Sequence, residues 1–463
     1  MCMGVLWICR SSLDPKVITT GWLFAALVSC SLALFQYFGL SHFLTPFASI
    51  ASEGEAFANL RQRNQFSSLC NIGFLALIWS VDKGLVPGGR WGIVLAALLA
   101  AGNAASVSRT GLIQLILIGC LGLLWKGFSW RRHLLWLLAC LSYVCAAMAL
   151  LMALNIATGK DVPNILSRIQ TDLGCSSRTV LWSNVMELIT LKPWFGWGWG
   201  ELDFAHYVTA YSGARFCDIL DNAHNLPLHL AVELGVPTAV LVCGGFLFWI
   251  VRQRPWSEIH PTRQLAWGVL AMMLLHSMLE YPLWYGPFQM AFGLCTFLLW
   301  RRPQEIGASE GLTRKVTFSV GQHATTVAAL VLMSVSAYAM WDYHRVSQIY
   351  LAPEQRHPAY RENTLVRAAD SWFFGDQLRF AELHLTPLTR ENADWTFARA
   401  SAMLHYSPEP RVIEKLIESA VFLGRVEEAT LNLARYRAAF PKEHSQWAAS
   451  HATMPANSWT TLN

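Results

Sequence analysis

The sequence is poor in charge, since only 14% of its 463 residues are Asp, Glu, Lys or Arg. So few charges exclude an ordinary soluble class. Gly159-Lys160 lacks the rest of a phosphate-binding loop, and the chain has no Asp-x-Asp pair for a metal–nucleotide sugar. It also has no zinc-type Cys/His spacing and no Gly-x-Ser-x-Gly elbow. We therefore expect no cofactor, no metal site and no nucleic-acid partner.

Apolar residues dominate instead. The chain is 54% hydrophobic and has 21 tryptophans, which is typical of a polytopic membrane protein. About nine apolar runs have membrane length, and we predict an all-α fold from them. The predicted spans are 17–40, 67–82, 91–106, 111–128, 133–155, 226–251, 264–283, 285–300 and 322–341.

Basic residues orient these spans. The positive-inside rule places the segments that carry them in the cytoplasm. They are Arg10 and Lys16; Lys83 and Arg90; Lys126, Arg131 and Arg132; Arg252, Arg254 and Arg263; and Arg301, Arg302, Arg314 and Lys315. Four regions follow: spans at 17–155, a large periplasmic loop at 156–223, spans at 224–341, and a periplasmic tail at 342–463. In the tail, 412–440 resembles a helix pair of the tetratricopeptide type, suited to packing on the loop or to acceptor docking.

The stretch 221–238 joins the long outer loop to the next span. Asn225 is placed to cap that helix, and Pro227 falls in its first turn. His224 therefore precedes a helix N-terminus, facing whatever binds there. His229 and Glu233 share a face of the same helix, where a packed and satisfied histidine is the expectation. Glu280 and Tyr281 fall at the outer end of a later span, and Glu280 has either a site role or a solvated one.

Arginines also lie on the outer side, at Arg61, Arg63, Arg109 and Arg178. Each could be an interfacial residue whose charge reaches the lipid headgroups. Arginine's planar fork also suits a diphosphate, because it holds two oxygens at once. Three separate segments that offer arginines on the His224 side favour a diphosphate clamp.

The outer loop is not a plain linker. Apolar spacing over 178–190 predicts a helix on the membrane surface. Residues 192–200 alternate glycine with tryptophan, which suits either an interfacial aromatic belt or a platform for a sugar or a polyprenyl chain. Cys175 and Cys217 are the two cysteines of this loop, and an oxidising compartment would allow them to form a disulfide.

These motifs together resemble the bacterial protein O-oligosaccharyltransferases of the O-antigen ligase and polymerase superfamily, of the type that glycosylates pilin. The resemblance covers roughly residues 55–440. The motifs are Leu60-Arg61-Gln62-Arg63-Asn64-Gln65, Ser108-Arg109-Thr110-Gly111, the Trp/Gly run at 194–200, Asn222-Ala223-His224-Asn225 followed by Gly235-x-x-Thr238, and Glu280-Tyr281-Pro282-Leu283-Trp284-Tyr285.

The resemblance implies a role for each matching residue. It implies that His224 is essential and that Tyr281 supports activity. Glu280 is a further predicted catalytic group, because its position at the outer end of a span puts it near the level of His224. The donor diphosphate is bound by Arg61 or Arg63, Arg109 and Arg178, and by Gln62 or Gln65. Members of the family usually have further spans at the amino end, so this chain is expected to begin late relative to them.

The implied reaction needs neither metal nor nucleotide. A polyprenyl diphosphate is a good leaving group once arginines neutralise its charge, and a Ser or Thr hydroxyl needs a base. His224 suits that role, or it only hydrogen-bonds the diphosphate. The expected partners are a polyprenyl-diphosphate-linked glycan, membrane lipids and a pilin-like acceptor protein, with the site facing the periplasm at the inner membrane. The alternatives are a ligase to lipid A core, an O-antigen polymerase, and a transporter; the absence of an internal repeat counts against the transporter.

Overall fold

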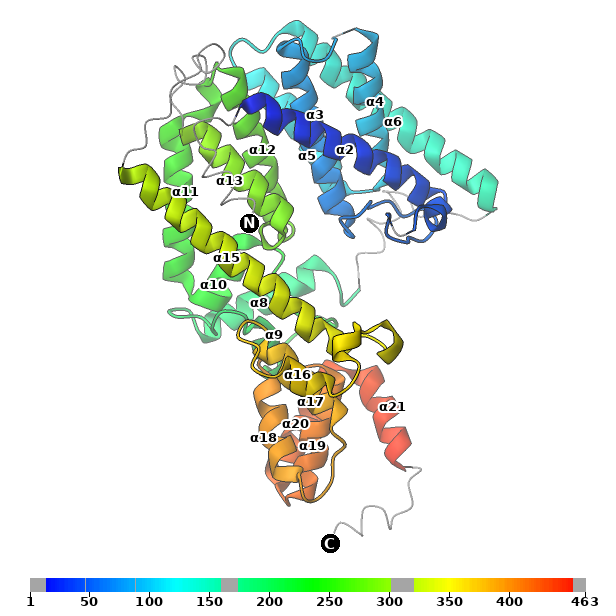
Figure 1. The fold of residues 1–463 in the computed structure, drawn as a ribbon, viewed down its shortest axis with the longest axis vertical. Helices are drawn as coiled ribbons and strands as arrows, with labels where there is room; N and C mark the ends of the chain where they lie inside the picture. The colour runs from blue at the N-terminus through cyan, green and yellow to red at the C-terminus, as the bar shows by residue number, and fades with distance from the viewer. Residues whose placement is uncertain (1–13, 46, 88, 160–173, 301–319, 453–463) are drawn as a thin grey trace.

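The computed structural model describes residues 14–45, 47–87, 89–159, 174–300 and 320–452, and every regular element within them is a helix. Figure 1 shows a body of helices above and a smaller helical tail below, with α15 running from one to the other. The helices of the body are α2 (Pro15–Tyr37), α3 (Arg63–Asp82), α4 (Arg90–Ala105), α5 (Arg109–Leu124), α6 (Trp130–Thr158), α8 (Arg178–Leu191), α9 (Leu202–Val208), α10 (Leu226–Leu234), α11 (Val236–Gln253), α12 (Pro261–Ser277) and α13 (Gly286–Trp300), with short 3-10 turns η1 (Leu40–Leu44), η2 (Pro255–Ser257) and η3 (Pro282–Trp284).

Within the described residues, four stretches are long and apolar enough to cross a membrane: 15–37, 130–158, 236–257 and 326–350. The helices α4, α5 and α13 are shorter but also apolar. Side chains on α11 such as Leu241 and Phe248 are 75% and 67% exposed, as expected of a surface that faces lipid. The chain is therefore a multi-pass membrane protein, and helices occupy all of the runs that the sequence predicts as spans.

One predicted span is not a single helix. The run 226–251 is two helices, α10 and α11, which meet at Gly235 with φ 87° and ψ 157°. Pro237 in the first turn of α11 and the positive φ of Gly235 prevent one continuous helix. The predicted span 264–283 also ends early, since α12 stops at Ser277 and leaves Glu280 and Tyr281 in a loop.

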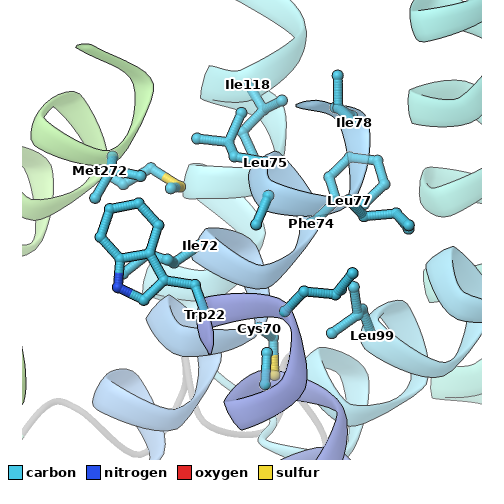
Figure 2. Close-up of a cluster of buried hydrophobic side chains, with 14 of the residues drawn as sticks. Trp22, Cys70, Ile72, Phe74, Leu75, Leu77, Ile78, Leu99, Ile118 and Met272 are labelled. Atoms are coloured by element: carbon cyan, nitrogen blue, oxygen red, sulfur yellow. The ribbon is translucent and has the colours of Figure 1, made fainter. Parts of the chain in front are cut away.

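The core of the body surrounds α3. Nearly every side chain of α3 from Gln65 to Ser80 is buried, because α2, α4, α5 and α12 all pack against it. Figure 2 shows Trp22 of α2, Leu99 of α4, Ile118 of α5 and Met272 of α12 around the apolar residues of α3. The helix that begins with the Arg-Gln-Arg-Asn-Gln motif is thus held rigidly on all sides.

A second, smaller core lies under the outer loop, of which residues 160–173 are outside the described chain. Leu181, Val185 and Leu188 of α8 pack with Leu202 of α9 and Val232 of α10. The predicted helix over 178–190 is confirmed as α8. Cys175 and Cys217 form a disulfide with a Cα–Cα distance of 5.5 Å.

Removing this disulfide should destabilise the loop. The bond closes a chain segment of 42 residues, so its loss should cost about 3–4 kcal/mol by the loop-entropy relation. The double variant Cys175→Ser/Cys217→Ser should melt at a lower temperature than the wild type in a thermal scan. Cys120→Ser, at an exposed free cysteine of α5, is the matched control and should melt like the wild type. Equal melting temperatures for all three proteins would contradict the prediction.

The tail continues from α15 (Val320–Ser347) into a group of short helices. They are α16 (Thr364–Ala368), α17 (Gly375–Leu385), α18 (Ala393–Met403), α19 (Pro410–Phe422), α20 (Val426–Ala439) and α21 (Pro441–Ala452), with 3-10 turns η4 (Gln348–Tyr350), η5 (Pro353–Gln355) and η6 (Pro358–Tyr360). The expected helix pair over 412–440 is present as α19 and α20. The tail rests on the outer loop, where Tyr207 packs in the tail's core and Glu201 pairs with His405. Residues 301–319, which hold the last predicted basic segment, and 453–463 lie outside the described chain.

Candidate functional site

The backbone of His224 is held in an uncommon conformation by its neighbours. Its φ of 51° lies in the left-handed region, which a non-glycine residue adopts only when its surroundings hold it there. The Asn222 side chain accepts a hydrogen bond from the His224 amide, and the Trp182 indole donates to the Ala223 carbonyl. Asn225 caps α10, as predicted, and its amide also donates to the Met278 carbonyl beyond α12. The imidazole is therefore anchored from both the loop and the helix bundle.

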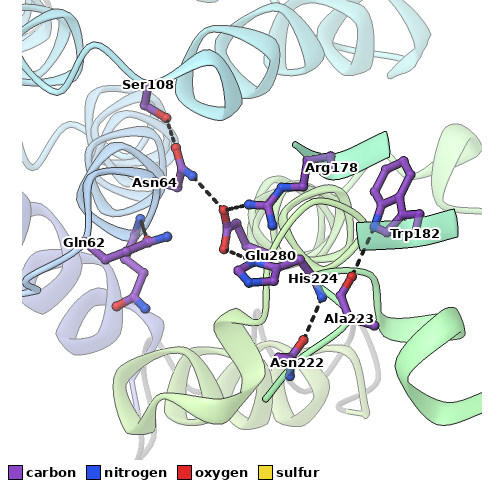
Figure 3. Close-up of polar contacts among 10 residues, drawn as sticks. Gln62, Asn64, Ser108, Arg178, Trp182, Asn222, Ala223, His224 and Glu280 are labelled. Carbon is purple, nitrogen blue, oxygen red and sulfur yellow. Dashed lines mark hydrogen bonds and ion pairs between the residues drawn. The ribbon is translucent and has the colours of Figure 1, made fainter. Parts of the chain in front are cut away.

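Glu280 is the centre of the polar contacts. Its Oε2 lies 2.8 Å from Nδ1 of His224, while Oε1 accepts from Arg178 and, at 3.2 Å, from Asn64 Nδ2 (Figure 3). Only 7% of Glu280 is exposed, so a solvated role is ruled out. Residues from four separate segments thus meet at one carboxylate.

The charge state of Glu280 follows from these contacts. Burial on its own would raise the pKa of the Glu280 carboxyl, but the hydrogen bond from His224 and the charge of Arg178 together hold that pKa below its usual value. Glu280 is therefore a carboxylate, which only accepts hydrogen bonds. It follows that Nδ1 of His224 carries a proton and donates it to the Glu280 carboxylate, whereas the other ring nitrogen, Nε2, takes no part in this bond.

Helix N-termini converge on the same place. The helices α3, α5, α8 and α10 begin beside the residues that meet at Glu280, and each is capped by a side chain: Gln62, Ser108, Ser177 and Asn225. The N-terminus of a helix carries partial positive charge, so several of them together favour an anion.

Backbone strain gathers at these N-termini as well. Seven non-glycine residues of the described chain have positive φ, and four of them are Ala58, Arg61, Val107 and His224. They lie in the three loops that lead into α3, α5 and α10. Such conformations persist where the surrounding structure imposes them, which is common at functional sites.

The predicted arginines differ in their surroundings. Arg178 is bound to Glu280, and Arg63 forms an ion pair with Glu55, so both have a carboxylate partner. Arg61 and Arg109 are exposed, and Arg109 is the first residue of α5. The bond from Ser108 to Asn64 brings the Arg109 segment to the start of α3. The sequence prediction of a diphosphate clamp stays a prediction.

The two predicted glutamines are used within α3. Gln62 caps the helix by accepting a hydrogen bond from the Gln65 amide, and Gln65 is itself only 2% exposed. Tyr281 lies beside His224, with the edge of one ring against the face of the other at a centroid distance of 4.9 Å. The structure therefore brings together His224, Glu280, Tyr281 and Arg178.

Asn64 is also a member of the site. It lies in the Arg-Gln-Arg-Asn-Gln motif, but no role is predicted for it from the sequence. Ser108 donates to its Oδ1 at 2.6 Å, which orients its amide toward Glu280. The hydroxyls of Ser67 and Ser68 both donate to its backbone carbonyl. Its position beside Arg63 in the Arg-Gln-Arg-Asn-Gln motif was the available signal.

The tryptophan–glycine loop packs on the break between α10 and α11. The amides of Trp197 and Gly198 donate to the carbonyls of Val232 and Glu233. A Cβ on Gly235 would lie 2.1 Å from the Trp194 carbonyl oxygen, so only glycine permits this approach. Among the described residues, no group of three His, Cys, Asp or Glu side chains is placed to hold a metal ion.

This geometry defines a class of protein: a multi-pass helical membrane protein in which a partly buried histidine pairs with a buried carboxylate beside converging helix N-termini. Residues 94–243 match the family described as O-antigen ligase, and residues 264–455 match the C-terminal part of the virulence factor membrane-bound polymerases. These two matches agree with the resemblance to the O-antigen ligase superfamily that the motifs of the sequence carry.

Two curated relatives come from Acinetobacter baylyi. A general O-oligosaccharyltransferase is 25% identical over 310 residues, which is 63% of this chain and 52% of the relative. A ComP-specific O-oligosaccharyltransferase is 27% identical over 291 residues, which is 62% of this chain and 52% of the relative. The matched region spans about half the length of each relative.

Proposed function

We propose that this protein transfers a glycan from a polyprenyl diphosphate to Ser or Thr hydroxyls of a pilin-like protein, on the periplasmic side of the bacterial inner membrane. The observation that carries the proposal is the His224–Glu280 pair at the meeting point of four helix N-termini. Such a place offers a base and an anion site together. In this proposal the predicted spans, about nine by length, cross the membrane, and the loop and tail lie in the periplasm.

The chemistry is a single displacement. Nε2 of His224 takes the proton of the acceptor hydroxyl as its oxygen attacks the anomeric carbon of the glycan. The bond between that carbon and the diphosphate oxygen breaks, and the polyprenyl diphosphate leaves with the bonding electrons. Glu280 stabilises the imidazolium that forms, since it accepts from Nδ1. Attack from the face opposite the leaving group inverts the anomeric configuration.

The diphosphate binds at the helix N-termini in this proposal. Arg61 and Arg109 are exposed there and can reach a ligand, while Arg178 offers its charge from beside Glu280. Gln62 and Gln65 shape the start of α3 and, with Arg63, complete the predicted donor site. Neutralising the diphosphate in this way stabilises the charge that develops on the leaving group.

The proposed function and its alternatives differ in the molecule that accepts the glycan. Similarity to two O-oligosaccharyltransferases favours a protein acceptor. The O-antigen ligase description of residues 94–243 keeps lipid A core as the second acceptor, and the polymerase description of residues 264–455 keeps a growing O-antigen chain.

The test uses the purified full chain in lipid nanodiscs with polyprenyl-diphosphate-linked glycan from the source bacterium. A pilin-like protein, lipid A core and O-antigen repeat units are offered as acceptors in separate reactions, and products are identified by mass spectrometry. We expect glycan on Ser or Thr of the protein. Transfer to lipid A core or to the repeat units alone would replace the proposal by the ligase or the polymerase. No transfer to any of the three would contradict it.

Lysine substitutions should distinguish a diphosphate clamp from interface anchors. Arg61→Lys and Arg109→Lys keep the charge but lose the planar fork, so turnover should fall about tenfold for each, as the loss of a charge-assisted hydrogen bond of about 1.5 kcal/mol predicts. Arg131→Lys, at the start of α6 on the predicted cytoplasmic side, is the matched control and should turn over like the wild type. If Arg61→Lys and Arg109→Lys also match the wild type, both arginines are interface anchors.

A further inference from the structure

Two tryptophans from distant segments stack beside the site. The rings of Trp199 and Trp284 are nearly parallel, at an interplanar angle of 13° and a centroid distance of 6.2 Å. They remain 63% and 40% exposed, so the pair presents aromatic surface outward. Trp199 comes from the glycine-rich outer loop, and Trp284 ends η3, which follows directly after Tyr281.

A buried pair of polar side chains, His229 and Glu233, lies against the tryptophans. The His229 ring lies edge-on against Trp284 at 5.0 Å and against Trp199 at 6.3 Å. His229 Nε2 is 3.5 Å from a carboxylate oxygen of Glu233, and each residue is only 2% exposed. The tryptophans are therefore backed by a rigid layer, and a ligand that binds them pays little conformational entropy.

Further aromatic residues contact His224 itself. The Tyr281 ring touches the His224 ring, and Tyr285 stacks on Tyr281 at 5.8 Å. Trp284 directly precedes Tyr285 in the chain, so the tryptophan pair lies next in sequence to the aromatic residues that contact His224. A chain of sugars whose first residue lies at His224 would extend toward this pair.

The other two tryptophans of the loop have different surroundings. The Trp197 indole donates to the Leu188 carbonyl and is tied into the loop's own core. Trp194 is 71% exposed, and its carbonyl lies against Gly235, where the candidate membrane span of α11 begins. An interfacial belt is thus the natural role of Trp194, whereas Trp199 is turned to Trp284.

We propose that Trp199 and Trp284 form a sugar-binding subsite, which holds the donor glycan's residues beyond the one whose anomeric carbon reacts. This inference rests on the proposed function. The C–H face of a pyranose is apolar and packs on an aromatic ring, while hydroxyls at its edge hydrogen-bond to indole N–H and phenol groups. The subsite selects donors that carry an oligosaccharide over donors that carry a single sugar.

The test compares two side chains at one position. Trp199→Leu keeps an apolar surface suited to an isoprenoid, and Trp199→Tyr keeps an aromatic ring suited to a sugar. The donor is the lipid-linked glycan of the source bacterium, used whole or trimmed by exoglycosidases to one sugar. With the whole donor, Trp199→Leu should raise KM about fivefold at nearly unchanged kcat, and Trp199→Tyr should stay near the wild type. With the trimmed donor, all proteins should have the same KM, and Trp194→Leu is the control in both series.

Three results would overturn the subsite: an unchanged KM in Trp199→Leu, an equal rise with the trimmed donor, or a rise in the acceptor's KM alone. Binding of both donors to a His224→Ala protein separates this failure from failure of the proposed function. If the wild type transfers no glycan, yet whole donor binds about fivefold tighter than trimmed donor and Trp199→Leu removes the difference, the subsite stands and the transfer reaction fails. If whole and trimmed donor bind equally, the subsite is wrong.

Discussion

His224→Ala should lower glycan transfer by at least about a hundredfold, which is the smaller end of what a general base contributes. The acceptor hydroxyl would then lose the group that takes its proton, while donor binding at the helix N-termini should persist. The measurement is kcat with saturating donor and acceptor, together with the dissociation constant of the donor. A large fall in kcat at an unchanged dissociation constant is the expected pair of results.

The matched control is His133→Ala, in the first turn of α6, where the ring packs on Phe128. It should keep wild-type transfer. Asn222→Ala adds a second comparison, because it removes the acceptor of the His224 amide without touching the imidazole, and should cause a smaller loss. Wild-type kcat in His224→Ala would exclude a base at this position. If His224→Ala instead binds the donor more weakly but keeps a normal kcat, His224 acts in diphosphate binding.

Glu280→Gln should lower kcat by about a hundredfold, although the side chain keeps its size. A glutamine amide can donate to Nδ1 of His224, which would place the proton on Nε2 and remove the lone pair that accepts from the hydroxyl. The change also leaves Arg178 without its carboxylate partner. The measurement is kcat across pH, with donor binding as the check that the protein is intact.

The sign of the pH effect follows from the lowered pKa of Glu280. A carboxylate with a lowered pKa contributes stability above about pH 5, and this contribution is lost as the pH falls through the folded-state value. The wild type should therefore melt above Glu280→Gln near neutral pH, and the gap should close in acid. Glu258→Gln is the matched control, because Glu258 pairs with Arg263 at the opposite end of α12 and should not affect kcat. A normal kcat in Glu280→Gln would show that Glu280 does not determine the tautomer of the His224 imidazole.

The local parts of the site could be predicted from the sequence. The cap at Asn225, the helix at 178–191 and the position of His224 before a helix depend on residues within a turn or two of each other. The break at Gly235 was missed because an apolar run of membrane length reads as one helix, whereas the loop at 192–200 occupies the gap between α10 and α11. The role of Asn64 was missed because its partner lies 216 residues away.

Composition and short-range spacing are enough to predict a helical membrane protein with a histidine at the start of a helix. Which groups meet is visible only in the folded chain, where His224, Arg178 and Asn64 reach Glu280 across 56, 102 and 216 residues. The same holds for Cys175 and Cys217, whose Cα atoms lie 5.5 Å apart, and for Trp199 on Trp284. The physical reason is that contacts between distant segments depend on how the helices pack around α3 and α8, and no local pattern encodes that packing.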